Sequence, residues 1–304
     1  MKFYCKLLCS GLVCFFVGTL TCQAQKGSKV VYKDYTRMEA TLLDSLKQEG
    51  VMAQFKGMRG LRRQAQTVKE NTPLNIEIRP AEKRKMKPEE IIEKRRESVL
   101  TVNKYQGVTT RPDAVEGWAA AVVLTEDGVC VSNYHVFWEM LDPMAKLNPV
   151  DSIIFVATED GRVYPITRIL SFSKSGDMAI FKIDTRGDIL TPMPLGDDLP
   201  AGRNVHMLSH PEGYPYAYTN GVVFRTITLN PEDTFARRME ITADYAKGAS
   251  GGPIMDDRGN MVSMVSSIRS IFYSNQPPYN QQMNVKLTIP ISSIKRLIQS
   301  DGDK

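Results

Sequence analysis

The sequence predicts an all-β domain, either a barrel or a sandwich, that follows a basic and mainly helical N-terminal extension. From Ser98 onward, short runs of β-branched and apolar residues alternate with turns, which is the pattern of an all-β fold. Before Ser98 the apolar residues recur at roughly helical spacing. Hydrophobic residues make up 42% of the 304 residues, which is enough apolar material for one or two packed domains.

The first 24 residues have the features of a secretory signal peptide. Two lysines precede an apolar run over residues 7–20, and the small side chains of Cys22 and Ala24 follow it. This pattern predicts cleavage after Ala24 and a periplasmic or secreted bacterial protein. The apolar run is shorter than the roughly 20 residues of a membrane-spanning helix, so we expect no transmembrane segment after cleavage. Lipid modification of Cys22 is the alternative, although Thr21 matches that signal poorly.

Four of the five cysteines lie within this segment, and only Cys130 remains in the mature chain. A single cysteine cannot form an internal disulfide, so the stability of an exported protein must come from core packing. Cys130 stands in a Val-Cys-Val run, where we expect it to be a small buried hydrophobe.

The mature chain divides into two parts of opposite charge. Residues 25–96 hold 18 Lys and Arg against 10 Asp and Glu, whereas residues 97–304 hold 19 against 24. Three interpretations of the basic part remain open: a solvated helical extension, a regulatory or oligomerising element that docks on the acidic part, or a binder of anionic surfaces. Export makes nucleic acid an unsuitable partner. Self-docking or a homo-oligomer would follow from the second interpretation.

The extension, residues 25–97, begins with a predicted helix over 35–69 that Gly50 interrupts. Residues 73–87 are polar and contain two prolines, which predicts a linker. Pro88 then starts a short helix that ends near Glu97, because proline fits a first helical turn and the acidic residues after it suit the helix dipole.

The domain over residues 98–304 is predicted to contain many short strands and a last helix over 291–298. An Asp-Gly pair at Asp127 signals a hairpin turn. The expected strands are 99–102, 119–124, 129–132, 152–157, 162–169, 178–183, 204–209, 221–228, 239–243, 253–255 and 261–267.

The run Gly248-Ala249-Ser250-Gly251-Gly252-Pro253 is the strongest chemical signal. Glycines around a serine allow a tight turn that exposes the hydroxyl and gathers backbone N–H groups at one point. Such a point can hold the negative oxygen of an attacked carbonyl. A glycine-rich surface turn is the simpler interpretation of the motif taken alone.

A serine nucleophile needs a base, and the chain has only three histidines. His135 follows an apolar strand-like run, at a position where a cleft can form, and we assign it the role of base. His206 stands within a strand-like stretch and fits a structural role. His210 precedes a turn, where we expect it to be exposed or to stabilise the loop.

The base in turn needs a half-buried carboxylate to orient it. Asp177 directly precedes the apolar run Met-Ala-Ile-Phe and is our candidate. Asp160, Asp184 and Asp188 are alternatives in more polar, turn-like surroundings.

The order His135, Asp177, Ser250 and their contexts resemble the chymotrypsin-like serine proteases, with the HtrA/Deg protease domain as the nearest match. The resemblance covers residues 98–298 and includes SNYHVF, GDMAIFKI, GASGGPIMDDRGNMVSMV, MPLGDDLPAGRNV, HPEGYP and LTIPISSIKRLI. It implies two perpendicular β-barrels with the site between them. It also implies polypeptide substrates and an oxyanion hole from the N–H groups of Gly248 and Ser250.

The sequence departs from the family in three places. Only 54 residues follow Ser250, so we expect no PDZ domain and no PDZ-gated activation. Ala119-Ala120-Ala121 replaces a Gly-Ser-Gly, which indicates a packing change. Ala249 replaces the aspartate of digestive trypsins, so activation through an ion pair with a newly cut N-terminus is not expected.

Substrate preference is the least determined property. Asp244 lies six residues before Ser250, the spacing at which trypsins carry the pocket acid that selects Lys or Arg. A loop-stabilising or solvated aspartate is the other interpretation, and the family resemblance implies a preference for small apolar residues.

These residues predict a serine endopeptidase that acts through an acyl-enzyme and requires no cofactor and no metal. Clustered Cys and His ligands are absent from the sequence. The alternatives are a catalytically silent polypeptide-binding module and an esterase. The esterase fits less well, because the sequence context of Ser250 fits a chymotrypsin-like barrel instead of the Gly-x-Ser-x-Gly elbow of α/β-hydrolases.

Overall fold

The computed structural model describes residues 30–48, 50–106, 114–147 and 152–299. The chain divides into two compact units, residues 1–33 and 34–304. The described part of the first unit, residues 30–33, contains no helix or strand. The predicted signal peptide, with Cys22 and Ala24, lies outside the described residues. Within the described chain, no helix is long and apolar enough to cross a membrane.

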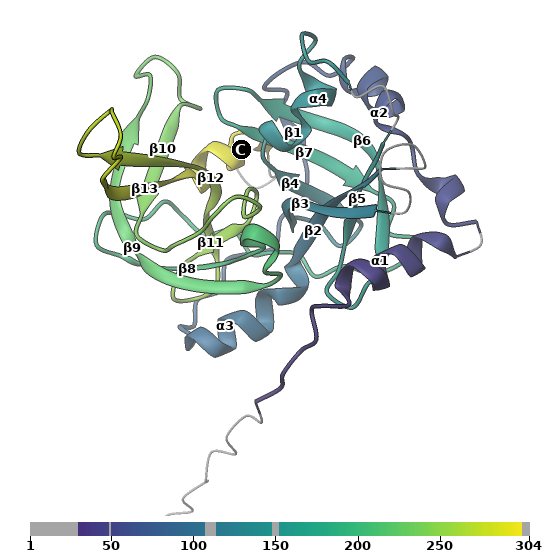
Figure 1. Cartoon of the computed structure of the whole chain (residues 1–304), viewed down its shortest axis with the longest axis horizontal. Coiled ribbons are helices and arrows are strands. Elements are labelled where there is room, and N and C mark those ends of the chain that lie inside the picture. The colour runs from purple at the N-terminus through teal and green to yellow at the C-terminus, as the bar shows by residue number, and fades with distance from the viewer. Residues whose placement is uncertain (1–29, 49, 107–113, 148–151, 300–304) are drawn as a thin grey trace, which may run out of the picture. The chain divides into compact units, whose positions relative to one another are not determined.

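The second unit contains two closed antiparallel barrels of six strands each (Figure 1). The first has the order β2-β3-β4-β7-β6-β5, with bounds β2 Val99–Gln106, β3 Ala114–Val123, β4 Val129–Ser132, β5 Ile153–Ala157, β6 Val163–Ser173 and β7 Met178–Ile183. The second has the order β10-β13-β12-β11-β8-β9, with bounds β8 Asn204–Ser209, β9 Ala217–Thr228, β10 Arg237–Ile241, β11 Pro253–Met255, β12 Met261–Phe272 and β13 Gln281–Pro290. The double-barrel prediction is confirmed.

Each barrel has an apolar interior, and a third apolar cluster lies between the barrels. Phe137 and Phe181 are fully buried in the first barrel, and Val205 and Ile254 in the second. The third cluster draws on both barrels, including Met178, Leu208, Met255 and Met264. Cys130 is fully buried among the first-barrel residues, and burial raises the pKa of its thiol. It packs as a small hydrophobe, as its sequence context predicts.

Two separate helices, α1 (Met38–Lys47) and α2 (Met58–Ala65), replace the helix predicted over 35–69. A short 3₁₀ turn, η1 (Met52–Gln54), follows the break at Gly50, whose φ of +76° is unsuited to a helix. Buried residues of α1 pack on the first barrel beside Phe155, and those of α2 join the first-barrel core. The buried apolar stripes explain why these residues recur at helical spacing.

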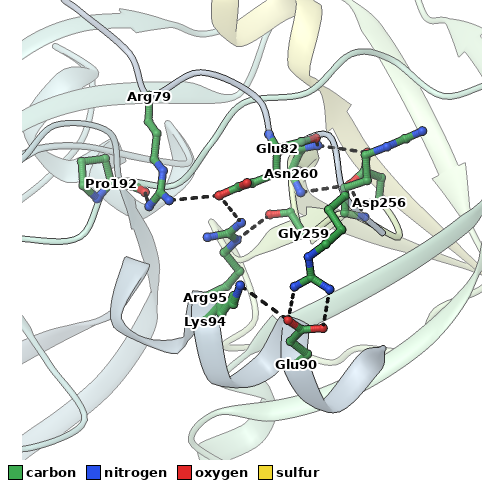
Figure 2. Close-up of polar contacts among 11 residues, drawn as sticks. Arg79, Glu82, Glu90, Lys94, Arg95, Pro192, Asp256, Gly259 and Asn260 are labelled. Atoms are coloured by element: carbon green, nitrogen blue, oxygen red, sulfur yellow. Dashed lines mark hydrogen bonds and ion pairs between the residues drawn. The ribbon is translucent and has the colours of Figure 1, made fainter. Parts of the chain in front are cut away.

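The segment predicted as a linker, residues 73–87, packs along the second barrel. It contains the two-residue strand β1 (Leu74–Asn75) and leads into α3 (Pro88–Arg95) and η2 (Arg96–Ser98). Figure 2 shows its polar anchor. The Asn260 side chain accepts a hydrogen bond from the Glu82 N–H at 2.7 Å and donates one to the Glu82 carbonyl at 3.0 Å. The buried Arg95 guanidinium donates to the Gly259 carbonyl at 2.9 Å and lies 3.4 Å from the Glu82 carboxylate.

The C-terminal helix, α5 (Ile291–Lys295), is shorter than the predicted span of 291–298. Ile298 instead belongs to β14 (Ile298–Gln299), which pairs in parallel with β1, so that Leu74 lies opposite Ile298. The helix therefore stops early because its last residues complete a small sheet with the N-terminal extension. Three further short helices are η3 (His135–Phe137), α4 (Trp138–Leu141) and η4 (Pro211–Gly213).

Candidate active site

His135 begins the short helix η3, three residues after strand β4 ends at Ser132. The strand is buried throughout, while the His135 side chain is 47% exposed. The abrupt change from strand to helix turns the imidazole out of the barrel core. Asn133, within this corner, donates a hydrogen bond from Nδ2 to the Asp177 carbonyl at 3.0 Å. The corner and the Asp177 turn are therefore tied together.

Asp177 ends a tight turn that immediately precedes β7, and its φ of +54° places it in the left-handed region. Aspartate tolerates this conformation better than most residues. Its carboxylate accepts hydrogen bonds from the His135 backbone N–H at 3.1 Å and the Ser266 hydroxyl at 2.6 Å. It also lies 2.9 and 3.0 Å from His135 Nδ1. With Nδ1–H donating to the carboxylate, Nε2 is left free to accept a proton.

Ser250 lies between β10 and β11, in a turn that uses a positive φ at Gly248 and at Gly251. Its Oγ lies 2.8 Å from His135 Nε2. The turn is held against the first barrel, because the Ala120 N–H donates to the Ser250 carbonyl at 2.8 Å. A Cβ on Gly251 would stand 2.2 Å from the Ala120 carbonyl oxygen, so only glycine permits this approach.

The N–H groups of Gly248 and Ser250, predicted to form an oxyanion hole, both belong to this turn. Among the described residues, neither N–H donates a hydrogen bond. The neighbouring N–H groups of Ala249, Gly251 and Gly252 are all bonded, to carbonyls of Ala246, Val265 and Ala249. The turn therefore contains two N–H donors that have no partner among the described residues.

Asp244, the candidate pocket acid, lies on the loop after β10 with its side chain 81% exposed. Its carboxylate lies 2.6 Å from the Nζ of Lys286, a residue of β13 whose side chain is almost fully buried. Lys286 also donates to the Tyr245 carbonyl. The negative charge of Asp244 is thus offset by a lysine of the same barrel.

Among the described residues, neither of the other two histidines hydrogen-bonds Ser250. His206 bonds the Tyr218 hydroxyl at 2.8 Å and Asp257 at 3.2 Å, which is the structural role expected of it. His210 stabilises its loop by accepting the Tyr216 N–H at 3.0 Å, but it is buried rather than exposed. Burial lowers the pKa of His210 to about 4. In the part of the chain that is described, no group of three His, Cys, Asp or Glu gathers in a way that could hold a metal ion.

Ser266 is the residue at this site that sequence reasoning missed. It stands in β12, in a run of serines and apolar residues that carries no motif. Only the register of β12 beside the Asp177 turn brings its hydroxyl to the carboxylate. The structure therefore joins His135 and Asp177 of the first barrel with Ser250 and Ser266 of the second.

The family comparison agrees with this geometry. A family model for the trypsin-like peptidase domain matches residues 119–264, which include His135, Asp177 and Ser250. Residues 119–264 are a trypsin-like peptidase domain. No PDZ family model matches the chain.

The peptidase domain is homologous to the Deg/HtrA serine endoproteases. The chain is 26% identical over 189 residues to Protease Do-like 5, chloroplastic, of Arabidopsis thaliana, covering 60% of this chain and 57% of that protein. It is 26% identical over 183 residues to a probable periplasmic serine endoprotease DegP-like of Marinomonas sp. (strain MWYL1), covering 59% of this chain and 35% of that protein. The chain therefore spans only part of the length of these relatives.

A solved structure shares the fold. The crystal structure of Deg5 superposes with a TM-score of 0.51 at 21% identity, covering 68% of this chain and 90% of that one. At this identity the superposition supports the double-barrel architecture and says nothing of activity.

Proposed function

We propose that this chain is an exported serine endopeptidase that hydrolyses peptide bonds through an acyl-enzyme. The observation that carries the proposal is the chain of contacts from Ser250 Oγ to His135 Nε2 at 2.8 Å and from His135 Nδ1 to Asp177 at 2.9 Å. A serine becomes a useful nucleophile when an oriented base can remove its proton.

In this mechanism His135 Nε2 takes the hydroxyl proton as Ser250 Oγ attacks the scissile carbonyl. The Asp177 carboxylate keeps the proton of His135 on Nδ1 and stabilises the imidazolium that forms. His135 then donates its proton to the leaving amine, which breaks the C–N bond and leaves an ester on Ser250. A water molecule, deprotonated by His135, hydrolyses that ester and restores the hydroxyl.

The oxyanion of the tetrahedral intermediate would be held by the N–H groups of Gly248 and Ser250. Their lack of partners among the described residues supports this role, since preorganised donors need no rearrangement when the charge develops. The buried Lys286 offsets the charge of Asp244. We therefore propose that Asp244 stabilises its loop and that it does not select a basic residue.

For the organisation of the chain we propose a signal peptide over 1–24, an extension over 25–97 and a peptidase domain over 98–304. Cleavage after Ala24 would release the protein to the periplasm or the medium. The relatives described as periplasmic or chloroplastic are consistent with a protein that acts outside the cytosol.

The test is active-site labelling of the purified full chain with a fluorophosphonate, beside a Ser250→Ala variant. We expect one label per wild-type molecule, none on the variant, and cleavage of an unfolded protein substrate by the wild type only. Folded wild-type protein that takes no label would contradict the proposal and favour a polypeptide-binding module.

A further inference from the structure

A cavity of about 400 Å³ adjoins the proposed oxyanion position. Its walls come from the start of α1, from β2 and β3, from η4, which carries Glu212, and from the loop that carries Gly248. The volume falls within the range of about 300–1,000 Å³ that is usual for ligand pockets. Because Gly248 is one of its walls, a polypeptide whose scissile carbonyl lies against Gly248 would pass the mouth of this cavity.

Most of the charged side chains that line the cavity are acidic. Glu39, Glu116 and Glu212 line it and are exposed. Within the described chain, none of their carboxylates forms an ion pair. Lys247 is the cation among the described lining residues, and His210 is neutral at pH 7 because burial lowers its pKa to about 4.

Aromatic and aliphatic side chains supply the apolar part of the lining. Tyr35 and Met38 come from the N-terminal extension, and Trp118 comes from β3. The Lys104 ammonium lies over the Trp118 ring, 3.7 Å from the ring centroid, in a cation–π contact. The same ammonium forms an ion pair with Glu139 at 3.3 Å. Apolar walls beside free carboxylates suit a ligand with a long aliphatic stem and a positive end.

We propose that this cavity binds a Lys or Arg side chain of the polypeptide substrate, on the C-terminal side of the scissile bond. The proposal rests on the proposed peptidase function. Lysine and arginine combine an aliphatic stem with a cationic head, as the lining requires. The C-terminal side follows from the walls: β3 pairs with β4, the strand that leads to His135, and His135 must reach the leaving amine.

The extension thereby contributes to substrate selection. Tyr35, Met38 and Glu39 belong to it, and Leu42 of α1 is buried against the first barrel. On the opposite wall the Glu212 N–H donates to the Lys247 carbonyl at 2.6 Å, which fixes the loop next to Gly248. Both walls are therefore anchored before a substrate arrives.

The test compares wild type with Glu39→Gln, Glu116→Gln and the double variant, all as full chains. Cleavage sites in unfolded casein are mapped by mass spectrometry, and matched peptides then carry Lys or norleucine at each of the first three positions after the scissile bond. An exposed ion pair changes affinity by a factor of about two to five. We therefore expect the kcat/KM preference for Lys to fall about five- to twentyfold in the double variant.

Glu232→Gln is the matched control, because Glu232 is exposed and lies outside the cavity lining. It should leave the Lys preference unchanged, and fluorophosphonate labelling should be equal in all variants. The proposal is overturned if wild type shows no preference for Lys over norleucine at any of the three positions, or if the double variant keeps it.

A second measurement separates failure of this proposal from failure of the peptidase function. The Ser250→Ala protein is titrated with the Lys and norleucine peptides, and fluorescence anisotropy reports binding without turnover. The proposal is supported if the Ser250→Ala protein binds the Lys peptide more tightly than the norleucine peptide, and if this difference disappears when Glu39→Gln and Glu116→Gln are added. This result would count even if the wild type cleaves nothing. Equal binding of both peptides refutes it even if wild type is an active peptidase.

Discussion

Replacement of Gly248 by alanine should disable the oxyanion site while leaving the three side chains of the triad in place. The φ of Gly248 is +90°, and a Cβ there would stand 2.7 Å from the His210 carbonyl oxygen and 3.3 Å from the Glu212 nitrogen. Both neighbours are backbone atoms, so no flexible side chain can give way. To reach an ordinary contact of 3.4 Å, the two segments must separate by about 0.7 Å.

A displacement of that size moves the Gly248 N–H out of the roughly 2.7–3.1 Å window in which it can stabilise an oxyanion. Loss of one such donor costs a factor of about 10²–10³ in kcat. The unfavourable backbone angle adds about 1–3 kcal/mol of destabilisation. We therefore expect Gly248→Ala to show both a large catalytic defect and a moderate loss of stability.

Gly202→Ala separates these two effects. Gly202 has a similar φ of +85°, but no atom lies within 4 Å of the point that an added Cβ would occupy. This variant should lose similar stability in urea titrations while kcat for a casein-derived peptide stays within about threefold of wild type. A kcat for Gly248→Ala equal to that of Gly202→Ala would show that the Gly248 N–H is not an oxyanion donor.

Three further outcomes are expected. Ser266→Ala removes the hydrogen bond to Asp177. We expect kcat to fall about tenfold, because a hydrogen bond to a charged group is worth about 1.5 kcal/mol or more. KM and the free energy of unfolding measured in urea should change little. The pKa of His210 is about 6.5 in the unfolded chain and about 4 in the folded protein. The unfolded state therefore binds the proton more tightly, and the free energy of unfolding should fall by up to about 3 kcal/mol as the pH drops from 6.5 to 4. Urea titrations of His210→Asn should show a flatter pH dependence of this free energy. Arg95→Ala leaves the buried Gly259 carbonyl without its donor and should cost about 2–3 kcal/mol, whereas full stability by urea titration would show that this anchor contributes little.

The candidate site could be found from sequence because each of its three members carries a local signature. Glycines flank Ser250, an apolar strand precedes His135, and another follows Asp177. These are short-range patterns that strand ends and tight turns impose directly. Ser266 and Lys286 have no such signature. Their partners, Asp177 and Asp244, are 89 and 42 residues away in the chain, so only barrel closure reveals them.

The fold likewise combines elements that have a local sequence signature with contacts that have none. Eleven of the twelve barrel strands were predictable, because short apolar and β-branched runs between turn residues mark them one at a time, whereas β13 (Gln281–Pro290) was missed. The segment over 73–87 reads as a linker because it is polar and contains prolines. Its attachment depends on hydrogen bonds to Asn260 and on pairing between the two-residue strands β1 and β14. Neither contact leaves a periodic pattern in the sequence.

The opposite net charges of the two parts of the chain have little to do with how the extension is held. Four of the described ion pairs close within the extension itself, namely Arg79–Glu82, Arg84–Glu90, Lys94–Glu90 and Arg95–Glu82, whereas Arg96–Glu159 joins the extension to the first barrel. What joins it to the barrels is burial: Leu46, Leu61 and Ile91 are completely inaccessible to solvent. Burial of apolar surface, unlike attraction between exposed charges, is not weakened by salt screening. The α1 wall of the cavity beside Gly248 should therefore persist at high ionic strength, where only the attraction of its carboxylates for a basic side chain declines.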